Sequence, residues 1–188
     1  MKAKLKFLLL ALLFAAPLAA AWLLFFVRPD WQPGGHTNYG SLVSPARPLP
    51  DLMLADASGL AAAFPTGKWT LVYLGRSSCD APCVERLLLG RQVRTALNQN
   101  RDRVQRVYLA PDAAALASAR TQLASDHPDL LYFSANGPAA ARFFEADDPR
   151  ALYLLDPQAH WLMSYSGVVE FKALLADIKK LLRFSQVG

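Results

Sequence analysis

An uncharged apolar run of 21 residues, from Phe7 to Val27, is the feature that most constrains this chain. A helix of that length rises about 30 Å, which matches the hydrocarbon core of a bilayer. Three of the first six residues are lysines, and Arg28 alone follows the run closely. The positive-inside rule therefore places the N-terminus in the cytoplasm and the rest of the chain across the membrane. We expect residues 1–28 to form a membrane anchor with a short cytoplasmic tail.

A cleaved signal peptide is the competing interpretation of this segment. The small residues Ala19, Ala20 and Ala21 would suit a cleavage site. The apolar run, however, continues through residues 22–27, beyond that point, which favours an uncleaved anchor. In either case the rest of the chain lies outside the cytoplasm, where disulfide bonds are permitted.

The charge of the chain is concentrated at its N-terminal end. The formal net charge is +5, from 20 Lys and Arg and 15 Asp and Glu among 188 residues. Four of the basic residues and none of the acidic ones lie in the first 28 positions, so the remainder is close to neutral. This balance argues against a nucleic-acid-binding domain.

The exported part divides into a linker and one domain. Residues 29–49 are rich in proline and include a Gly34–Gly35 pair, which predicts a linker or an irregular arm. Residues 50–188 alternate between apolar runs typical of strands and periodic segments typical of helices, which indicates an α/β sheet with helices on its faces. The expected strands are 52–54, 69–74, 104–109, 130–133, 151–155 and 161–165, and the expected helices are 80–98, 113–124, 137–144 and 168–183.

Cys79 and Cys83, the two cysteines of the chain, directly follow the buried strand 69–74 and a short loop. If a helix begins near Asp80, their spacing of four places both sulfurs on one face of its first turn. A helix N-terminus lowers the pKa of a thiol, and Arg76 acts in the same direction. Two such thiols can form a short reversible disulfide or hold a soft cation such as Cu(I).

A purely structural disulfide, or two buried thiols, is the plainer alternative. A loop of five residues gains little closure entropy, so a disulfide there is a poor structural crosslink. The junction between a strand and a helix at the carboxyl end of a sheet is also where α/β folds place their sites. Both considerations favour a reactive role, and not a purely structural one, for Cys79 and Cys83. We expect Cys79, at the exposed end of the loop, to be the attacking thiol.

At these residues the sequence resembles the Sco/SenC family of thioredoxin-like, membrane-anchored proteins that assist assembly of cytochrome c oxidase. The resemblance is carried by the Gly67-Lys68-Trp69 strand start, by the Tyr73-Leu74-Gly75 strand end, and by two cysteines with three residues between them. It extends weakly over residues 48–183. It implies a thioredoxin-like fold with a central mixed sheet flanked by helices, a possible copper site at Cys79 and Cys83, and an inner-membrane protein of a bacterium with its C-terminal domain in the periplasm.

The resemblance also shows two departures. Val84 stands where the family usually has a proline after the second cysteine, and Asp148 falls at the place of the family's third copper ligand, a histidine. A carboxylate is a hard ligand and a poor match for Cu(I), so tight copper binding is in doubt. Pro149 is the candidate for the cis-proline that faces the cysteines in thioredoxin-like folds.

Other candidate residues have plainer interpretations. We expect His36, His127 and His160 to be solvated loop histidines, Met163 to pack in the core, and Asp147–Asp148 to lie in a solvated loop or at a helix end. The segment 38–42 resembles small proteins that accompany oxidase assembly factors. A run of arginines is either a docking face for an acidic partner or anionic lipid, or an ordinary charged helix face. Its members are Arg86, Arg91, Arg94, Arg101, Arg103 and Arg106.

Two functions remain open from the sequence. The first is a thiol–disulfide oxidoreductase or copper-delivery protein that acts on the copper subunit of cytochrome c oxidase through Cys79 and Cys83. The second is a non-catalytic scaffold that binds an oxidase subunit or another assembly factor and keeps the cysteines in a static bond. A peroxidase-like function is less favoured, because the loop does not show the supporting Arg and Thr around a single cysteine.

Overall fold

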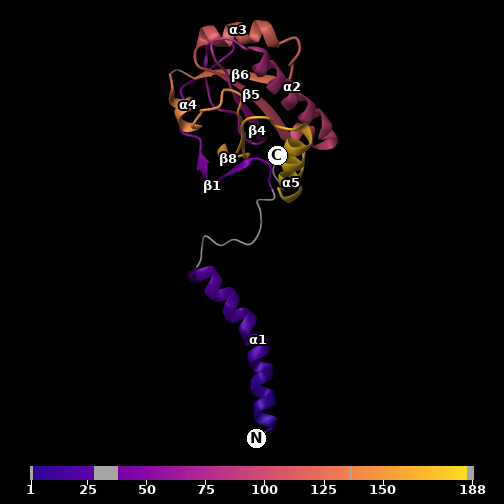
Figure 1. Cartoon of the computed structure of the whole chain (residues 1–188). Helices are drawn as coiled ribbons and strands as arrows, with labels where there is room; N and C mark the ends of the chain where they lie inside the picture. The colour runs from indigo at the N-terminus through magenta and orange to yellow at the C-terminus, as the bar shows by residue number, and fades with distance from the viewer. Residues whose placement is uncertain (1, 28–37, 136, 186–188) are drawn as a thin grey trace. The chain divides into compact units, whose positions relative to one another are not determined.

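The structure is a computed structural model that describes residues 2–27, 38–135 and 137–185 (Figure 1). The chain divides into two units, residues 1–37 and residues 38–188. The first unit contains helix α1 (Lys2–Val27), with Pro17 inside it. Residues Ala3–Val27 are long and apolar enough to cross a membrane, and none of this span is buried inside the protein.

The second unit is built on an eight-stranded mixed sheet with the order β1-β8-β7-β4-β5-β6-β2-β3. The central strands β4, β5 and β6 run parallel, and all the other neighbouring pairs are antiparallel. The bounds of the strands are β1 Ser41–Pro48, β2 Leu54–Asp56, β3 Ala61–Ala62, β4 Trp69–Leu74, β5 Val104–Ala110, β6 Leu130–Ala135, β7 Leu152–Leu155 and β8 His160–Tyr165.

Helices cover both faces of this sheet. The bounds are α2 Ala81–Ala96, a 3₁₀ helix Asn98–Arg103, α3 Ala113–Leu123, α4 Ala139–Phe143 and α5 Phe171–Phe184. The mixed sheet flanked by helices that the resemblance implies is therefore observed. Each strand and helix expected from the sequence has a counterpart within a few residues of its expected range, whereas β1 and β3 were not expected.

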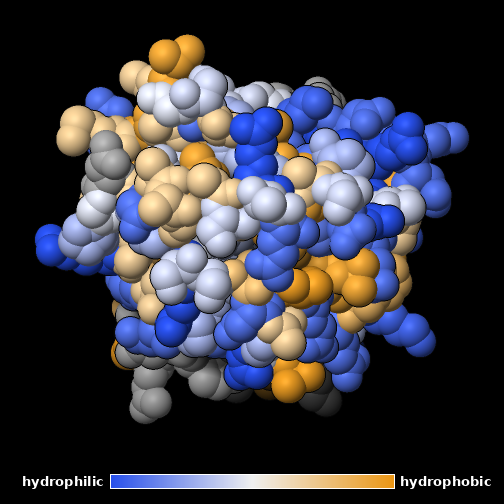
Figure 2. All heavy atoms as spheres, turned by 90° about the horizontal axis from the view of Figure 1, so that it is seen from above, coloured by the Kyte–Doolittle hydropathy of each residue, from blue (hydrophilic) through white to orange (hydrophobic). Residues whose placement is uncertain are grey.

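Side chains along the central strands point alternately to the two faces of the sheet, and each face has its own buried core. Leu71 and Tyr73 of β4 face the core beneath α2, α3 and α5, whereas Val72 between them faces the core that includes Phe144 beside α4. Successive side chains of a strand point to opposite faces, so a strand covered on both sides reads as a continuous apolar run. Seen from above, the domain shows hydrophobic residues in small groups among hydrophilic ones (Figure 2), whereas α1 exposes its large apolar side chains throughout.

The folded domain begins earlier than the sequence suggested. We expected the linker to extend to residue 49, but residues 41–48 form the edge strand β1, which pairs with β8. Pro45 and Pro48 concealed this strand, because proline lacks the N–H that a central strand donates. An edge strand tolerates it, and the β1–β8 register also shifts between Leu42 and Arg47. The strand expected at 52–54 lies slightly later, at Leu54–Asp56, and pairs with the short β3.

Candidate disulfide site

The cysteine loop begins where β4 ends, at the carboxyl end of the central parallel strands. The N–H of Gly75 donates to the carbonyl oxygen of Leu109 at 2.8 Å, which extends the β4–β5 pairing by one residue. A Cβ atom on Gly75 would overlap the hydroxyl of Tyr108, so only glycine fits at this approach. The loop then runs to Asp80 and into α2, which is the position at which α/β sheets place their functional sites.

Cys79 and Cys83 form a disulfide across the first turn of α2, with their Cα atoms 5.2 Å apart. Asp80 is the N-cap of the helix, and its carboxylate accepts the N–H of Cys83 at 3.1 Å. Pro82 lies in the first turn, where its missing N–H has no helical partner to lose. The side-chain amide of Gln122 donates to the carbonyl oxygen of Cys79 at 2.9 Å and ties the loop to α3.

Both cysteines are almost completely buried. Cys79 is 5% exposed and Cys83 is 2% exposed, and both belong to the core beneath α2. The expectation that Cys79 lies at an exposed end of the loop is therefore wrong for the disulfide form. Because both cysteines belong to the main core, we expect that a partner thiolate reaches the disulfide only when the loop moves.

Three tyrosines occupy paired positions on β4, β5 and β6, on the face of the sheet whose core contains the disulfide. The ring centroids of Tyr73 and Tyr108 are 5.8 Å apart, and those of Tyr108 and Tyr132 are 6.1 Å apart. The Tyr73 hydroxyl donates to the carbonyl oxygen of Pro149, whereas those of Tyr108 and Tyr132 have no hydrogen-bond partner among the described residues. Burial raises the pKa of Tyr73 to about 12, with Asp80 adding to the effect, so its phenol stays neutral. Sequence reasoning missed this row, whose signal is one tyrosine in each of three strands.

Arg86 lies one turn after Cys83 and is also buried. One of its terminal nitrogens donates to the carbonyl oxygen of Gly167, in the loop between β8 and α5, and the other has no partner in the described part of the chain. Burial lowers the pKa of this guanidinium, and Asp148 opposes that shift. Arg86 thus fixes the first turns of α2 to the loop before α5.

Asp148 and Pro149 lie in a tight turn that faces the cysteine loop. The N–H of Ala151 donates to the carbonyl oxygen of Asp148 at 3.1 Å, which places Pro149 at the second position of a β-turn. The Asp148 carboxylate accepts the N–H groups of Gly167 and Arg150. Burial raises the pKa of Asp148, but these hydrogen bonds outweigh it and hold the pKa below its usual value.

The peptide bond before Pro149 is not cis, which corrects the expectation from the resemblance. Among the described residues the cis bond is Ser44–Pro45, in β1. Proline is favoured at the second position of a β-turn, because its fixed φ angle suits that position without a cis bond. Pro149 nevertheless faces the cysteine loop, as expected.

A hollow of about 360 Å³ separates this turn from the cysteine loop. Its charged rim carries two arginines and two aspartates, so it presents both signs of charge beside the disulfide. A second hollow of about 240 Å³ lies between α2 and the loop before α5, and Pro82 and Arg150 line both. The larger hollow is lined by Tyr73, Arg76, Ser78, Asp80, Pro82, Asp148, Pro149 and Arg150.

The described residues do not complete a copper site. The two sulfurs would be soft ligands once reduced, but no group of three His, Cys, Asp or Glu side chains comes together in the parts of the chain that the structure describes. Asp148 already accepts two backbone hydrogen bonds. His127, just before β6, and His160, at the start of β8, lie at the end of the sheet away from the cysteine loop. His36 lies outside the described residues.

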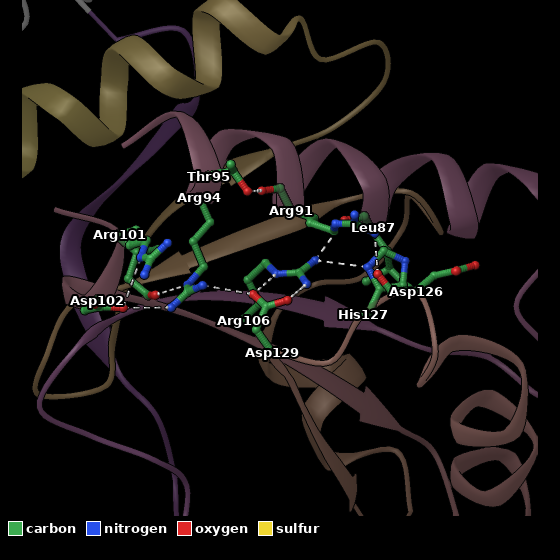
Figure 3. Close-up of polar contacts among 11 residues, drawn as sticks. Leu87, Arg91, Arg94, Thr95, Arg101, Asp102, Arg106, Asp126, His127 and Asp129 are labelled. Atoms are coloured by element: carbon green, nitrogen blue, oxygen red, sulfur yellow. Dashed lines mark hydrogen bonds and ion pairs between the residues drawn. The ribbon is translucent and has the colours of Figure 1, made fainter. Parts of the chain in front are cut away.

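The arginine run does not form one exposed charged face, because Arg86 and Arg106 are buried and only Arg91 and Arg101 of the six are exposed. Arg106 is buried and donates to both carboxylate oxygens of Asp129, at 2.6 and 3.1 Å, and to the carbonyl oxygen of Leu87 at 2.9 Å. Figure 3 shows its guanidinium between Asp129 and His127. Arg94 donates to the carbonyl oxygen of Val104 and also pairs with Asp129.

Two histidine expectations need revision as well. His127 is 2% exposed and is therefore a buried residue and not a solvated one. Burial lowers its pKa, and Arg106 beside it adds to the effect. His160 is half-buried, and its Nδ1 pairs with the Asp156 carboxylate at 2.9 Å. Met163 is buried in the main core, as expected.

Solved structures share this fold at low sequence identity. The copper-bound ScoI of Arabidopsis thaliana gives a TM-score of 0.58 at 16% identity, covering 78% of this chain and 99% of that one. The copper-bound Sco1 of yeast gives 0.59 at 19%, covering 80% and 96%. The apo Sco1 of Thermus thermophilus gives 0.59 at 19%, covering 78% and 98%. The expected likeness to Sco/SenC proteins is thus confirmed for the fold.

Sequence comparison defines the family. A search of curated proteins found no match. The family described as "transmembrane-like, thioredoxin-like, C-terminal domain" matches residues 69–185, a span that begins at β4, contains both cysteines and ends after α5. Because this match covers more than half of the sequence, the chain belongs to the family of transmembrane-like, thioredoxin-like C-terminal domains.

Proposed function

We propose that this chain is a membrane-anchored thiol–disulfide exchange protein that acts on the cysteines of the copper subunit of cytochrome c oxidase. The observation that carries the proposal is the Cys79–Cys83 disulfide at the N-terminus of α2, after the central strand of a thioredoxin-like sheet. Unpaired amides at a helix N-terminus favour a thiolate, so the reduced pair is suited to exchange.

The positions of the two cysteines support a specific order of exchange steps. The Cys79 thiolate attacks a partner disulfide, a mixed disulfide forms, and one partner thiolate leaves. Cys83 then attacks the Cys79 sulfur, which releases the partner as a dithiol and leaves Cys79–Cys83 oxidised. A dithiol donor on the same side of the membrane must reduce the pair again. Cys83 belongs to the helix and Cys79 precedes the N-cap Asp80, which supports Cys79 as the attacking residue.

The location proposed for the domain rests on α1 and its flanking charges. The apolar helix could span a membrane, and the lysines before it favour a cytoplasmic N-terminus. We place the protein in a bacterial inner membrane with the domain in the periplasm, an oxidising compartment that suits a protein with a disulfide.

A trapping experiment tests the exchange function. Cys83→Ser leaves Cys79 without its resolving partner, so in cells that assemble cytochrome c oxidase it should accumulate a mixed disulfide with the copper subunit. Cys79→Ser is the matched control and should accumulate none. Absence of any mixed disulfide with Cys83→Ser would contradict the proposal.

Copper delivery is a more specific form of the same proposal, in which the reduced cysteines carry copper. Two relatives of this fold are described with copper bound. In this chain Cys79 and Cys83 would be the soft ligands, and the described residues add no third. Titration of the reduced protein against a chromogenic Cu(I) chelator measures this directly. We expect weak binding that disappears in Cys79→Ser/Cys83→Ser. One tightly held copper would reveal a further ligand outside the described residues.

A scaffold is the second candidate, and the burial of both cysteines favours it. In that case the disulfide stays closed, and a partner binds elsewhere on the domain. The Cys79→Ser/Cys83→Ser variant discriminates between the two functions. Loss of oxidase assembly with normal amounts of the variant supports exchange, whereas full assembly supports the scaffold.

A further inference from the structure

We propose that the outer face of α5 is a docking surface for the headgroups of an anionic lipid bilayer. This face carries Lys172, Lys179 and Arg183, which are all exposed. Their intervals of seven and four residues place them along one side of the helix. Ala176 is exposed between them and leaves their charges unobstructed.

The packing of α5 determines which side faces solvent. Leu174, Ile178 and Leu182 are buried in the main core, so the basic side chains must lie on the opposite side. The single acidic residue of the helix, Asp177, is 2% exposed. It therefore does not neutralise the outer face.

Asp177 instead holds the first described residues of the domain. Its carboxylate accepts the N–H of Tyr39 at 2.9 Å and that of Gly40 at 2.9 Å, and it also accepts the hydroxyl of Tyr165. Figure 1 shows α5 beside the place where the chain enters the domain. The strand that follows this entry is β1, so the entry point is fixed to both the helix and the sheet.

The covalent chain limits how far this entry can be from a membrane. Residues 28–37 connect α1 to Asn38, and ten residues reach at most about 36 Å when fully extended. With α1 in a bilayer, the entry residues that Asp177 holds are therefore separated from the membrane-spanning helix by at most about 36 Å of chain. A tether of this length raises the effective concentration of one surface at the other without any new contact.

Two exposed aromatic side chains that adjoin α5, one from the segment held by Asp177 and one from the last residue of the helix, also suit an interface between lipid and water. Tyr39 is 72% exposed and Phe184 is 76% exposed. Aromatic rings favour the headgroup level of a membrane, and lysines and arginines near an anionic surface add attraction. An acidic protein would also attract the charges, but the short tether to a membrane-spanning helix favours the bilayer.

A fluorescent probe at Ala176 tests the proposal in the full chain. Both native cysteines are in the disulfide, so Ala176→Cys provides a single reactive thiol and leaves every charge in place. The labelled chain is reconstituted in nanodiscs of phosphatidylcholine alone or with added phosphatidylglycerol. We expect a blue-shifted emission and reduced quenching by an aqueous quencher with phosphatidylglycerol, and reversal in high salt, where screening shortens to a few ångströms.

Charge variants connect the signal to this surface. Each lysine near an anionic membrane contributes about five-fold to partitioning, so Lys172→Gln/Lys179→Gln should weaken docking about 30-fold and abolish the shift. The matched control Lys68→Gln/Arg142→Gln removes the same charge from exposed residues elsewhere and should retain it. Circular dichroism and an intact disulfide confirm that each variant is folded.

Three results would overturn the proposal. The first is an identical probe spectrum in the two kinds of nanodisc. The second is equal loss of the shift in the control variant, which would assign the effect to net charge alone. The third is a probe that stays exposed in phosphatidylglycerol nanodiscs but is protected in native membranes, which would assign the face to a protein partner.

Discussion

The side-chain amide of Gln122, near the end of α3, donates a hydrogen bond to the carbonyl oxygen of Cys79, 2.9 Å away. This contact fixes the first cysteine from a helix that is not part of the strand–loop–helix motif. Because the two cysteines are nearly inaccessible, we expect the mobility of this loop to determine how readily the disulfide is reduced.

Gln122→Ala should therefore accelerate reduction of the disulfide. The loop loses its anchor, and the free energy of unfolding should fall by about 1 kcal/mol. The measurement is the rate of reduction by dithiothreitol, followed by alkylation and mass spectrometry. Thr121→Ala is the control, because the Thr121 hydroxyl bonds within α3, to the carbonyl oxygen of Ala117. Equal rates in all three proteins would show that this loop does not limit access.

Asp80 combines two effects that separate variants can distinguish. Asp80→Asn keeps the N-cap acceptor but removes a negative charge beside the thiols, so in the reduced protein it should lower the pKa of the Cys79 thiol at little cost in stability. Asp80→Ala should lower that pKa and also destabilise the domain by about 1 kcal/mol. The pH dependence of iodoacetamide alkylation measures the thiol pKa.

Asp112 offers a matched control for Asp80. It caps α3 in the same way, and its carboxylate accepts the N–H of Ala115 at 2.8 Å. Asp112→Asn should therefore leave the alkylation profile unchanged. A profile that shifts equally in the two Asn variants would mean that overall charge, and not the neighbouring carboxylate, controls the thiols.

The central elements could be predicted because local pattern and tertiary environment agree there. The strand that begins at Trp69 is apolar except for Thr70, and β5 ends in the apolar run 107–110, since helices cover both faces of these strands. The edge strand β1 pairs on one side only and tolerates two prolines, so its sequence carries no comparable signal.

The candidate site was predictable only in part, for a related reason. The spacing of Cys79 and Cys83 and the strand before them indicated a helix N-terminus. The contacts that hold this site come from distant segments: Gln122 is 43 residues from Cys79, and Gly167 is 81 residues from Arg86. No local periodicity encodes such pairs, and none encodes the packing of the main core that buries the disulfide.

His127 should make the domain less stable in mild acid. Burial lowers its pKa below the ordinary value of 6.5, and Arg106 of β5 and Arg91 of α2 add to this, whereas Asp129 and Asp126 oppose it. The unfolded chain therefore takes up a proton near pH 6.5 that the folded chain resists. The stability contributed by neutral His127 is complete above about pH 6.5 and is lost as the pH falls below it.

Urea unfolding of the full chain in detergent, between about pH 5 and pH 7.5, measures this dependence. The wild-type midpoint should fall toward pH 5, and His127→Gln should flatten that slope. His160→Gln should retain it, because His127 is intact there. This window lies above the range in which Asp129 titrates. A slope that survives in His127→Gln would assign the acid sensitivity to another group.

The close approach of Gly75 to Tyr108 yields a double-mutant test of the junction between β4 and the cysteine loop. A Cβ on Gly75 would overlap the Tyr108 hydroxyl, so Gly75→Ala should destabilise the domain by about 1–3 kcal/mol. Tyr108→Phe alone should be neutral or stabilising, because it removes a buried hydroxyl that has no partner among the described residues.

The double variant should recover part of the loss, because the hydroxyl oxygen is the nearest obstacle and ring carbons lie just behind it. Urea unfolding of the four proteins gives the coupling free energy. Tyr73→Phe is the control for removing a phenol: its hydroxyl donates to the carbonyl oxygen of Pro149, so its loss should cost about 1 kcal/mol. If the effects of Gly75→Ala and Tyr108→Phe are additive, the backbone at Gly75 moves to make room for the added methyl group. The close approach to Tyr108 would then not determine where the cysteine loop begins.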